Sequence, residues 1–219
     1  SELEIMTRIR STRKMSTSTL ANPPLAFTPL FNSISSAAMT VAYTNNGNPL
    51  GSTYTIVLSS GSVYPNTFTG NTQMSTTAFA APLTGLAPNT TYFAYAAGIN
   101  WGSVPSVYAT LGSTATFAAD PLTVISTFSN VGFSSFTVSW SANGNPLSIT
   151  TYTVSLSTDG FVTKSAEFST APVFGPTATF TGLTGNTLYT FRVQAFNHNG
   201  SGTLFATLGS TQTAPITLI

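Results

Sequence analysis

A repeat with a period of 97 residues constrains the fold of this chain more than any other feature. The phrase NGNPL occurs at residues 46–50 and again at 143–147, and ATLGST occurs at 109–114 and again at 206–211. A period of this length is close to the usual size of one domain. We therefore expect two domains with two flanking segments: an extension at 1–21, domains at 22–118 and 119–215, and a tail at 216–219.

Apolar and polar residues alternate within each copy. In the second copy, for example, Tyr152, Val154 and Leu156 would share one face of an extended chain. Runs of this kind, about seven per copy and separated by clusters of Asn, Gly, Pro and Ser, predict an all-β antiparallel sandwich. Because Asn-Gly favours a turn with positive φ, we expect NGNPL to connect two strands.

Several phrases resemble one known family. They are TVSW ending at Trp140, TYTVSLS at 151–157, LTGNTLYTFRVQAFNHNG at 183–200 and, in the first copy, LAPNTTYFAYAAGINWG at 86–102. Together they resemble the fibronectin type III domain, an immunoglobulin-like β-sandwich. The resemblance covers residues 22–118 and 119–215, which is nearly the whole chain, and it implies two such domains in tandem.

The resemblance also implies roles for single residues. Tyr92 and Tyr189 match the family's corner tyrosine, whose hydroxyl bonds back to the backbone, and Trp140 matches its core tryptophan. The first copy departs from the pattern, with Tyr43 in place of that tryptophan and Ala94-Tyr95 where the second copy has Phe191-Arg192. Two copies this alike resemble the tandem arrays of bacterial extracellular and cell-surface proteins. We therefore expect an extracellular or bacterial cell-surface location.

Charge is sparse in this chain. Charged residues make up 5% of it, against about 25% in an average globular domain, while hydrophobic residues make up 42% and aromatic residues 12%. The apolar fraction is enough to build cores without a disulfide or a metal. Low charge also removes repulsion that normally keeps sheet edges apart, so the composition favours self-association.

No group of residues has the pattern of an active site. The chain's single histidine, His198, has no carboxylate close in sequence to orient it, and we expect it to be exposed in a turn. Asp120 would lie in the linker between the domains, and Asp159 and Glu167 would be surface charges around a turn. One His, no Cys and scattered acids do not form a metal shell. We predict that the chain is not an enzyme and needs no cofactor or metal.

Trp101 is the candidate ligand contact, because an exposed aromatic ring can stack on a sugar. It lies in the loop INWGSVP, where the second copy has His198. The alternative, which we favour, is that Trp101 packs on its own domain or between the domains, since tryptophan is rarely left exposed.

Residues 1–20 have no counterpart between the domains. Their apolar positions, Leu3, Ile5, Thr7 and Ile9, alternate with mainly charged ones, as in a strand with one apolar face. Three interpretations are open: a disordered tail, a basic arm that binds nucleic acid or an anionic membrane, or a strand donated to the sheet edge of a neighbouring copy. We favour strand donation, because a lone strand is unstable in water and a backbone edge can accept it. The apolar end at 216–219 would then extend the accepting surface.

These features together predict a non-enzymatic structural subunit of an extracellular filament, in which copies join head to tail. The alternative is a spacer or glycan-binding pair of modules from a larger adhesin or a secreted polysaccharide-degrading enzyme. We expect other copies of the chain, and under the alternative also glycans or a host surface, as partners, with no nucleic acid. No apolar run approaches the ~18 residues of a membrane span. The chain begins at Ser1 without a leader, so we expect that a leader was removed or that the chain is a fragment.

Overall fold

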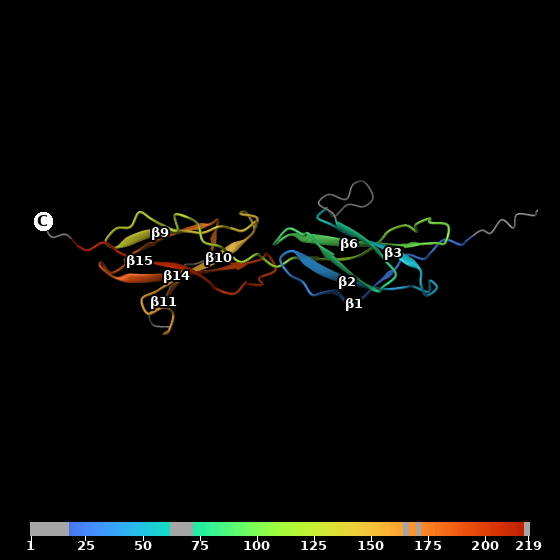
Figure 1. The fold of residues 1–219 in the computed structure, drawn as a ribbon, viewed down its shortest axis with the longest axis horizontal. Coiled ribbons are helices and arrows are strands. Elements are labelled where there is room, and N and C mark those ends of the chain that lie inside the picture. Colours follow the sequence, from blue (N-terminus) through green and yellow to red (C-terminus); the bar gives the residue numbers. More distant parts are fainter. Residues whose placement is uncertain (1–17, 62–71, 164–166, 170–171, 217–219) are drawn as a thin grey trace, which may run out of the picture.

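The computed structural model describes residues 18–61, 72–163, 167–169 and 172–216, and within them it consists of two β-sandwiches arranged end to end (Figure 1). The described chain begins at the far end of the first sandwich and finishes at the far end of the second. The proposed donor residues Leu3, Ile5, Thr7 and Ile9 lie outside the described residues, so strand donation stays a prediction.

The first sandwich, domain 1, has two antiparallel sheets. One sheet has the order β1-β2-β5 and consists of Leu25–Asn32, Ala38–Thr44 and Ala80–Thr84. The other has the order β4-β3-β6-β7 and consists of Thr72–Thr76, Thr53–Ser59, Thr91–Ile99 and Ala109–Ala115.

The second sandwich, domain 2, repeats this plan. Its first sheet has the order β13-β9-β8 and consists of Thr177–Thr181, Ser135–Ser139 and Phe128–Ser129. Its second sheet is built on β10 (Thr151–Ser157), β14 (Leu188–Phe196) and β15 (Ala206–Gln212), and the edge beyond β10 is shared by β11 (Glu167–Ser169) and β12 (Val173–Phe174). The described part of domain 2 therefore has eight strands, where the repeat predicted about seven, because two short strands replace β4.

The prediction of two all-β sandwiches is confirmed. Within the described residues no helix is long and apolar enough to cross a membrane.

Alternating side chains of facing sheets form the two cores. In domain 2, Trp140 packs edge-on against Tyr152, with ring centroids 5.2 Å apart. In domain 1, Tyr43 takes the place of the tryptophan, packs at 5.3 Å against Tyr54 and donates its hydroxyl hydrogen to the Ala78 carbonyl. Burial, with a smaller contribution from Tyr54, raises the pKa of Tyr43 to about 12. The shorter tyrosine therefore fills the core with a neutral, hydrogen-bonded hydroxyl.

The two corner tyrosines make equivalent bonds. The Tyr92 hydroxyl accepts a hydrogen bond from the Ala87 N–H at 2.9 Å, and the Tyr189 hydroxyl accepts one from the Thr184 N–H at 3.0 Å. Each bond ties the start of the long central strand, β6 or β14, to the loop that precedes it. This loop forms one end of its sandwich, so the corner positions the residues that meet between the domains.

The NGNPL phrases hold the chain where it enters each domain. In domain 1, Asn46 and Gly47 have positive φ (49° and 78°), as the turn chemistry predicts. The buried side chain of Asn48 then accepts from the N–H of Asn22 and donates to its carbonyl, both at 2.8 Å. In domain 2, Asn145 makes the same pair of bonds, both at 2.8 Å, to Ala119 in the linker.

Candidate functional site

Polar side chains of both domains contact one another where the domains meet. Asn89, in the loop before β6, is completely buried at its centre. Its Oδ1 accepts from the backbone N–H of His198 at 2.9 Å and lies 2.8 Å from Nδ1 of the same residue. Its Nδ2 donates to Oγ1 of Thr150 at 2.7 Å. One amide of domain 1 thus contacts two loops of domain 2.

These contacts determine the arrangement of the His198 ring. Because the Asn89 Oδ1 atom can only accept, Nδ1 carries a hydrogen, and in the neutral ring Nε2 then accepts from the Thr91 hydroxyl at 2.8 Å. His198 lies in an exposed turn, as predicted, but it also bridges the two domains. Sequence reasoning missed this role because its partners are more than 100 residues away in the chain.

The linker is held from both sides. In domain 1, the Asn89 N–H donates to the Phe117 carbonyl at 3.0 Å. From domain 2, the buried Asn197 donates its Nδ2 hydrogen to the Thr116 carbonyl at 3.1 Å. Ala118 is buried in the core of domain 2. Successive linker residues are therefore bonded or buried.

Each domain has two ends with distinct residues, which we name by the direction of the chain. The entry face of domain 2 carries Thr150, Asn197 and His198, and that of domain 1 carries the equivalent Ser52, Asn100 and Trp101. The exit face of domain 1 carries Asn89, Thr91 and Thr116, and that of domain 2 carries the equivalent Asn186, Leu188 and Thr213. Inside the chain, the exit face of domain 1 covers the entry face of domain 2. The other two faces lie at the two ends of the chain.

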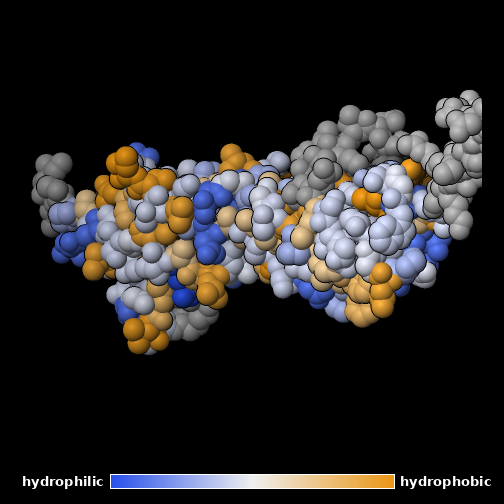
Figure 2. All heavy atoms as spheres, turned by 45° about the vertical axis from the view of Figure 1, so that its right-hand side comes forward, coloured by the Kyte–Doolittle hydropathy of each residue, from blue (hydrophilic) through white to orange (hydrophobic). Residues whose placement is uncertain are grey.

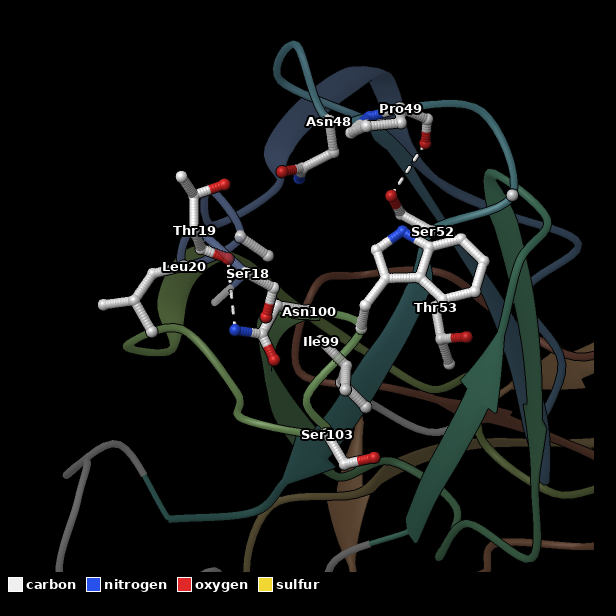
Figure 3. Close-up of a pocket in the computed structure, with 13 residues that line it drawn as sticks. Ser18, Thr19, Leu20, Asn48, Pro49, Ser52, Thr53, Ile99, Asn100 and Ser103 are labelled. Carbon is white, nitrogen blue, oxygen red and sulfur yellow. Dashed lines mark hydrogen bonds between the residues drawn. The ribbon is translucent and has the colours of Figure 1, made fainter. Parts of the chain in front are cut away.

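The entry face of domain 1 is a hollow of about 720 Å³ (Figure 3). Ser18, Thr19 and Leu20 line one part of it, Asn48, Pro49 and Ser52 line another, and Asn100 lies beside Thr19. Trp101 also lines this hollow, and 93% of its side chain is exposed. The expectation that Trp101 packs on its own domain or between the domains is therefore wrong: its loop lies at the outer end of domain 1, where no second domain of this chain reaches.

The end of the N-terminal extension also has a counterpart, contrary to the sequence-based expectation. Asn100 donates its Nδ2 hydrogen to the Thr19 carbonyl at 3.1 Å, just as Asn197 does to Thr116. Thr19-Leu20-Ala21 therefore corresponds to Thr116-Phe117-Ala118. The signal in the sequence is short, a threonine and an alanine separated by one apolar residue, and the change from Phe to Leu conceals it.

The exit face of domain 2 has the same local construction as that of domain 1. Asn186 has a φ of 55°, against 44° for Asn89, and its N–H donates to the Ala214 carbonyl at 3.2 Å. The hydroxyl of Thr213 accepts from the Thr187 N–H at 3.0 Å, as that of Thr116 does from Thr90. The side chains beyond this backbone are exposed, and Leu188, where domain 1 has Thr91, is 58% exposed.

The acidic candidates do not form a catalytic pair or a metal site within the described residues. Asp159 is held within its own loop: it accepts bonds from the hydroxyls of Thr163 at 2.6 Å and Ser157 at 2.7 Å, and these lower its pKa to about 2. Asp120 follows the linker, where its carbonyl accepts from Asn143. The side chain of Glu167 lies outside the described residues. Within the described part of the chain, no three His, Cys, Asp or Glu residues come together to hold a metal.

Arg192 takes part in a separate cluster on domain 2. Its guanidinium lies 4.0 Å from the ring centres of both Phe161 and Phe205, a double cation–π contact. This is the position where domain 1 has the buried Tyr95. On the face in Figure 2, strongly hydrophilic side chains are few and apolar ones occur in separate groups, as the low charge content predicts.

The comparisons with known proteins agree with this architecture. The family model described as fibronectin type III domain matches residues 122–208. This match covers most of domain 2. A solved two-domain fibronectin type III segment of chicken tenascin has the fold of the chain as a whole: it covers 88% of this chain and 100% of its own, with a TM-score of 0.56 and 17% identity. The search of curated proteins finds no match.

The resemblance seen in the sequence is therefore confirmed as a tandem pair of fibronectin type III-like domains. At 17% identity the tenascin segment shows the fold alone. Because this fold serves many functions, the function of the chain must be argued from its two ends and its interface.

Proposed function

We propose that this protein is a non-enzymatic structural subunit of an extracellular filament or cell-surface assembly, and that it works there as a stiff rod of two domains. The observation that carries the proposal is the buried interface around Asn89, which bonds to both Thr150 and His198. A spacer needs a defined length and direction, and such an interface provides both.

The energetics of the interface favour stiffness. Each hydrogen bond contributes about 0.5–1.5 kcal/mol net, but leaving a buried amide without a partner costs about 1–3 kcal/mol. Rotation of domain 2 away from domain 1 would expose or orphan both ends of the Asn89 side chain and break the bond from Asn197 to Thr116. The linker offers no flexible residues to absorb such a rotation, because Ala119 is held by Asn145.

Self-association is supported by composition. Charged residues make up 5% of the chain, so little electrostatic repulsion opposes the approach of two copies. The two domains have no cysteine and bury complete aromatic cores, so they need neither a disulfide nor a reducing compartment to fold.

The rod is tested by small-angle X-ray scattering of the purified chain. We expect a maximum dimension and a scattering profile that match the extended two-domain arrangement, and the same profile at low and high salt. The control is a variant with four Gly-Ser residues inserted between Ala118 and Ala119, which should give a broader distribution of dimensions. If the original chain is as broadly distributed as this control, the rod proposal is wrong.

Electron microscopy of the same samples tests the assembly. Strand donation from residues 1–21 predicts fibres that disappear when residues 1–14 are removed. Fibres that survive this truncation would contradict strand donation and would leave the structural role intact. A chain that forms no fibres or oligomers under any condition would contradict the filament itself.

A second candidate function, glycan binding by a spacer module, is favoured by one observation: Trp101 is 93% exposed in a hollow that polar side chains also line. An aromatic ring beside hydroxyl and amide groups suits a sugar. Affinity electrophoresis in gels containing soluble polysaccharides tests it. Retardation should be lost in Trp101→Ala and kept in Phe174→Ala, which removes another exposed aromatic side chain from domain 2. Equal mobility of all three chains would remove this function.

A further inference from the structure

We propose that the entry face of domain 1 is a docking site for the exit face of domain 2 of a second copy, so that copies stack head to tail through the contact that already joins the two domains of one chain. This inference rests on the proposed structural function and names its partner and its surface. It also differs from strand donation, because folded ends meet and no strand is exchanged.

The chain itself shows what covers an entry face. On domain 2, the surface formed by Thr150, Asn197 and His198 is covered by the exit face of domain 1. The equivalent surface on domain 1 is the hollow of about 720 Å³. The exit face that domain 1 uses recurs on domain 2 with the same backbone, down to the positive φ of Asn186. The two surfaces left at the ends of the chain are thus the two halves of one interface.

The decisive pair is Trp101 and Leu188. Their counterparts, His198 and Thr91, touch at 2.8 Å across the internal interface. A polar pair inside the chain is therefore replaced by an apolar pair at its ends, and both members are exposed, Trp101 by 93% and Leu188 by 58%. Docking would bring these two side chains into contact beside the buried asparagine position and remove part of each from water.

The polar positions are complementary too. Asn89 donates to the hydroxyl of Thr150, and the matching residues at the ends are Asn186 and Ser52, again an amide and a hydroxyl. In the single chain, Asn186 Oδ1 accepts from Gln212 Nε2 at 2.8 Å, which orients the amide. Because an amide oxygen has two lone pairs, Asn186 Oδ1 can accept a second hydrogen bond at the docked interface, as Asn89 Oδ1 accepts one from the His198 N–H.

Residues 18–21 hold part of the docking site in the single chain. Thr19 occupies the place at Asn100 that Thr116 occupies at Asn197. An incoming copy would bring its own Thr213 to that place, so Thr19 and Thr213 compete for one amide. Docking is then favoured when the N-terminal segment leaves. Strand donation makes the opposite prediction, because there the N-terminal segment is what joins the copies.

The experiment is sedimentation velocity over a range of concentrations, with each face blocked separately. Trp101→Glu should block the entry face and Leu188→Glu the exit face, and both side chains are exposed, so neither substitution should affect folding. We expect the unmodified chain to form a concentration-dependent series of oligomers and each blocked variant to be monomeric. A 1:1 mixture of the two variants should form dimers and nothing larger, because exactly one intact pair of faces remains.

Two further chains complete the test. Ile125→Glu places the same charge at another exposed apolar position and should associate like the unmodified chain. A chain lacking residues 1–19 keeps Asn22 and its bonds to Asn48. It should associate more tightly, because Thr19 no longer occupies Asn100, and its association constant should rise in proportion to the fraction of chains whose entry face is free. Oligomers that persist in both blocked variants, or association that is lost in the truncated chain, would overturn docking in favour of strand donation.

The docking proposal and the rod proposal can fail separately. If both the unmodified chain and the chain lacking residues 1–19 stay monomeric at every concentration, docking is overturned. Small-angle X-ray scattering of the monomer could still give the dimensions of the extended two-domain rod. A polysaccharide that binds the unmodified chain and Leu188→Glu equally, but not Trp101→Glu, would also count against docking if no oligomers form, since Trp101 would then serve a sugar.

Discussion

Asn89 and Asn186 occupy the same position in the two domains and have the same backbone, yet one is completely buried and the other is exposed. Both have positive φ, and both donate their N–H to the chain after the last strand. The difference in exposure has its cause outside the loop, because domain 2 covers Asn89 and no described domain covers Asn186. Local sequence therefore builds each end of the rod, and the neighbouring domain alone decides whether it is an interface or a surface.

The largest effect on this comparison is expected from unfolding domain 2, the domain that covers Asn89. Trp140→Ala deletes the largest side chain of the domain 2 core and should destabilise that domain by about 3–5 kcal/mol. Because the loss in the domain 2 core exceeds the expected coupling between the domains, calorimetry should show domain 2 melting first, in a transition separated from that of domain 1. A single transition shifted as a whole would mean that the coupling exceeds the loss in the core.

Once domain 2 has unfolded, Asn89 should behave like Asn186. We expect amide hydrogen exchange of the loop before β6 to be slow in the intact chain, and then to become as fast as in the equivalent loop before β14. Slow exchange at Asn89 in the absence of a folded domain 2 would show that its own domain protects it.

Substitution of the two asparagines sharpens the comparison directly. Glycine tolerates positive φ, so Asn89→Gly removes the side-chain bonds without straining the loop. We expect the coupling between the domains to fall by about 1–3 kcal/mol, since Thr150 and His198 lose a buried partner. Asn186→Gly should change stability by less than about 0.5 kcal/mol. Chemical denaturation followed by a probe in each domain measures both, and equal effects would contradict the assigned interface.

A smaller contrast is expected at His198 and Trp101. His198→Ala removes the ring contacts to Asn89 and Thr91 but keeps the backbone bond, and should cost about 1 kcal/mol of coupling. Trp101→Ala should leave the stability of the monomer within about 0.5 kcal/mol of the original, because its side chain is almost fully exposed. A marked loss of monomer stability in Trp101→Ala would mean that the ring packs on its own domain after all.

The smallest effect concerns a loop that the two domains do not share. Asp159 stands where domain 1 has Gly61, and the Thr163 and Ser157 hydroxyls hold its pKa at about 2, below the usual 3.8. A lowered pKa in the folded state stabilises the loop above the unfolded pKa, and this stabilisation is lost as the pH falls through about 2. A carboxyl-detected NMR titration should give this value. In Thr163→Ala the pKa should move back towards 3.8, and a pKa that does not move would contradict the assigned bonds.

Much of the fold could be predicted from the sequence, because it depends on short-range patterns that repeat. Alternation predicted the strands of both copies, Asn-Gly predicted the positive φ of the NGNPL turns, and the family phrases predicted the sandwich. The exposure of Trp101 was predicted wrongly. Whether a loop residue packs depends on which surface lies opposite, and nothing in INWGSVP indicates that this loop is at the end of the rod.

The interface itself had only a faint signal. Asn89, Asn197 and His198 meet across more than 80 residues of sequence, and their contacts depend on how the linker directs the second domain. The correspondence of Thr19 with Thr116 was hidden for the same reason: a matching backbone bond to Asn100 and Asn197 identifies it, and three residues of sequence do not.

The sequence by itself determined two β-sandwiches, their turns, their core aromatic residues and a surface with little charge. These follow from periodicity and from the conformational preferences of Asn and Gly, which act over a few residues. Only the tertiary structure decided that one asparagine amide joins the two domains and that, among the described residues, Trp101 and Leu188 are exposed at the two end faces. The reason is that burial belongs to a pair of surfaces, and a chain with two copies of each surface can cover only one pair within itself.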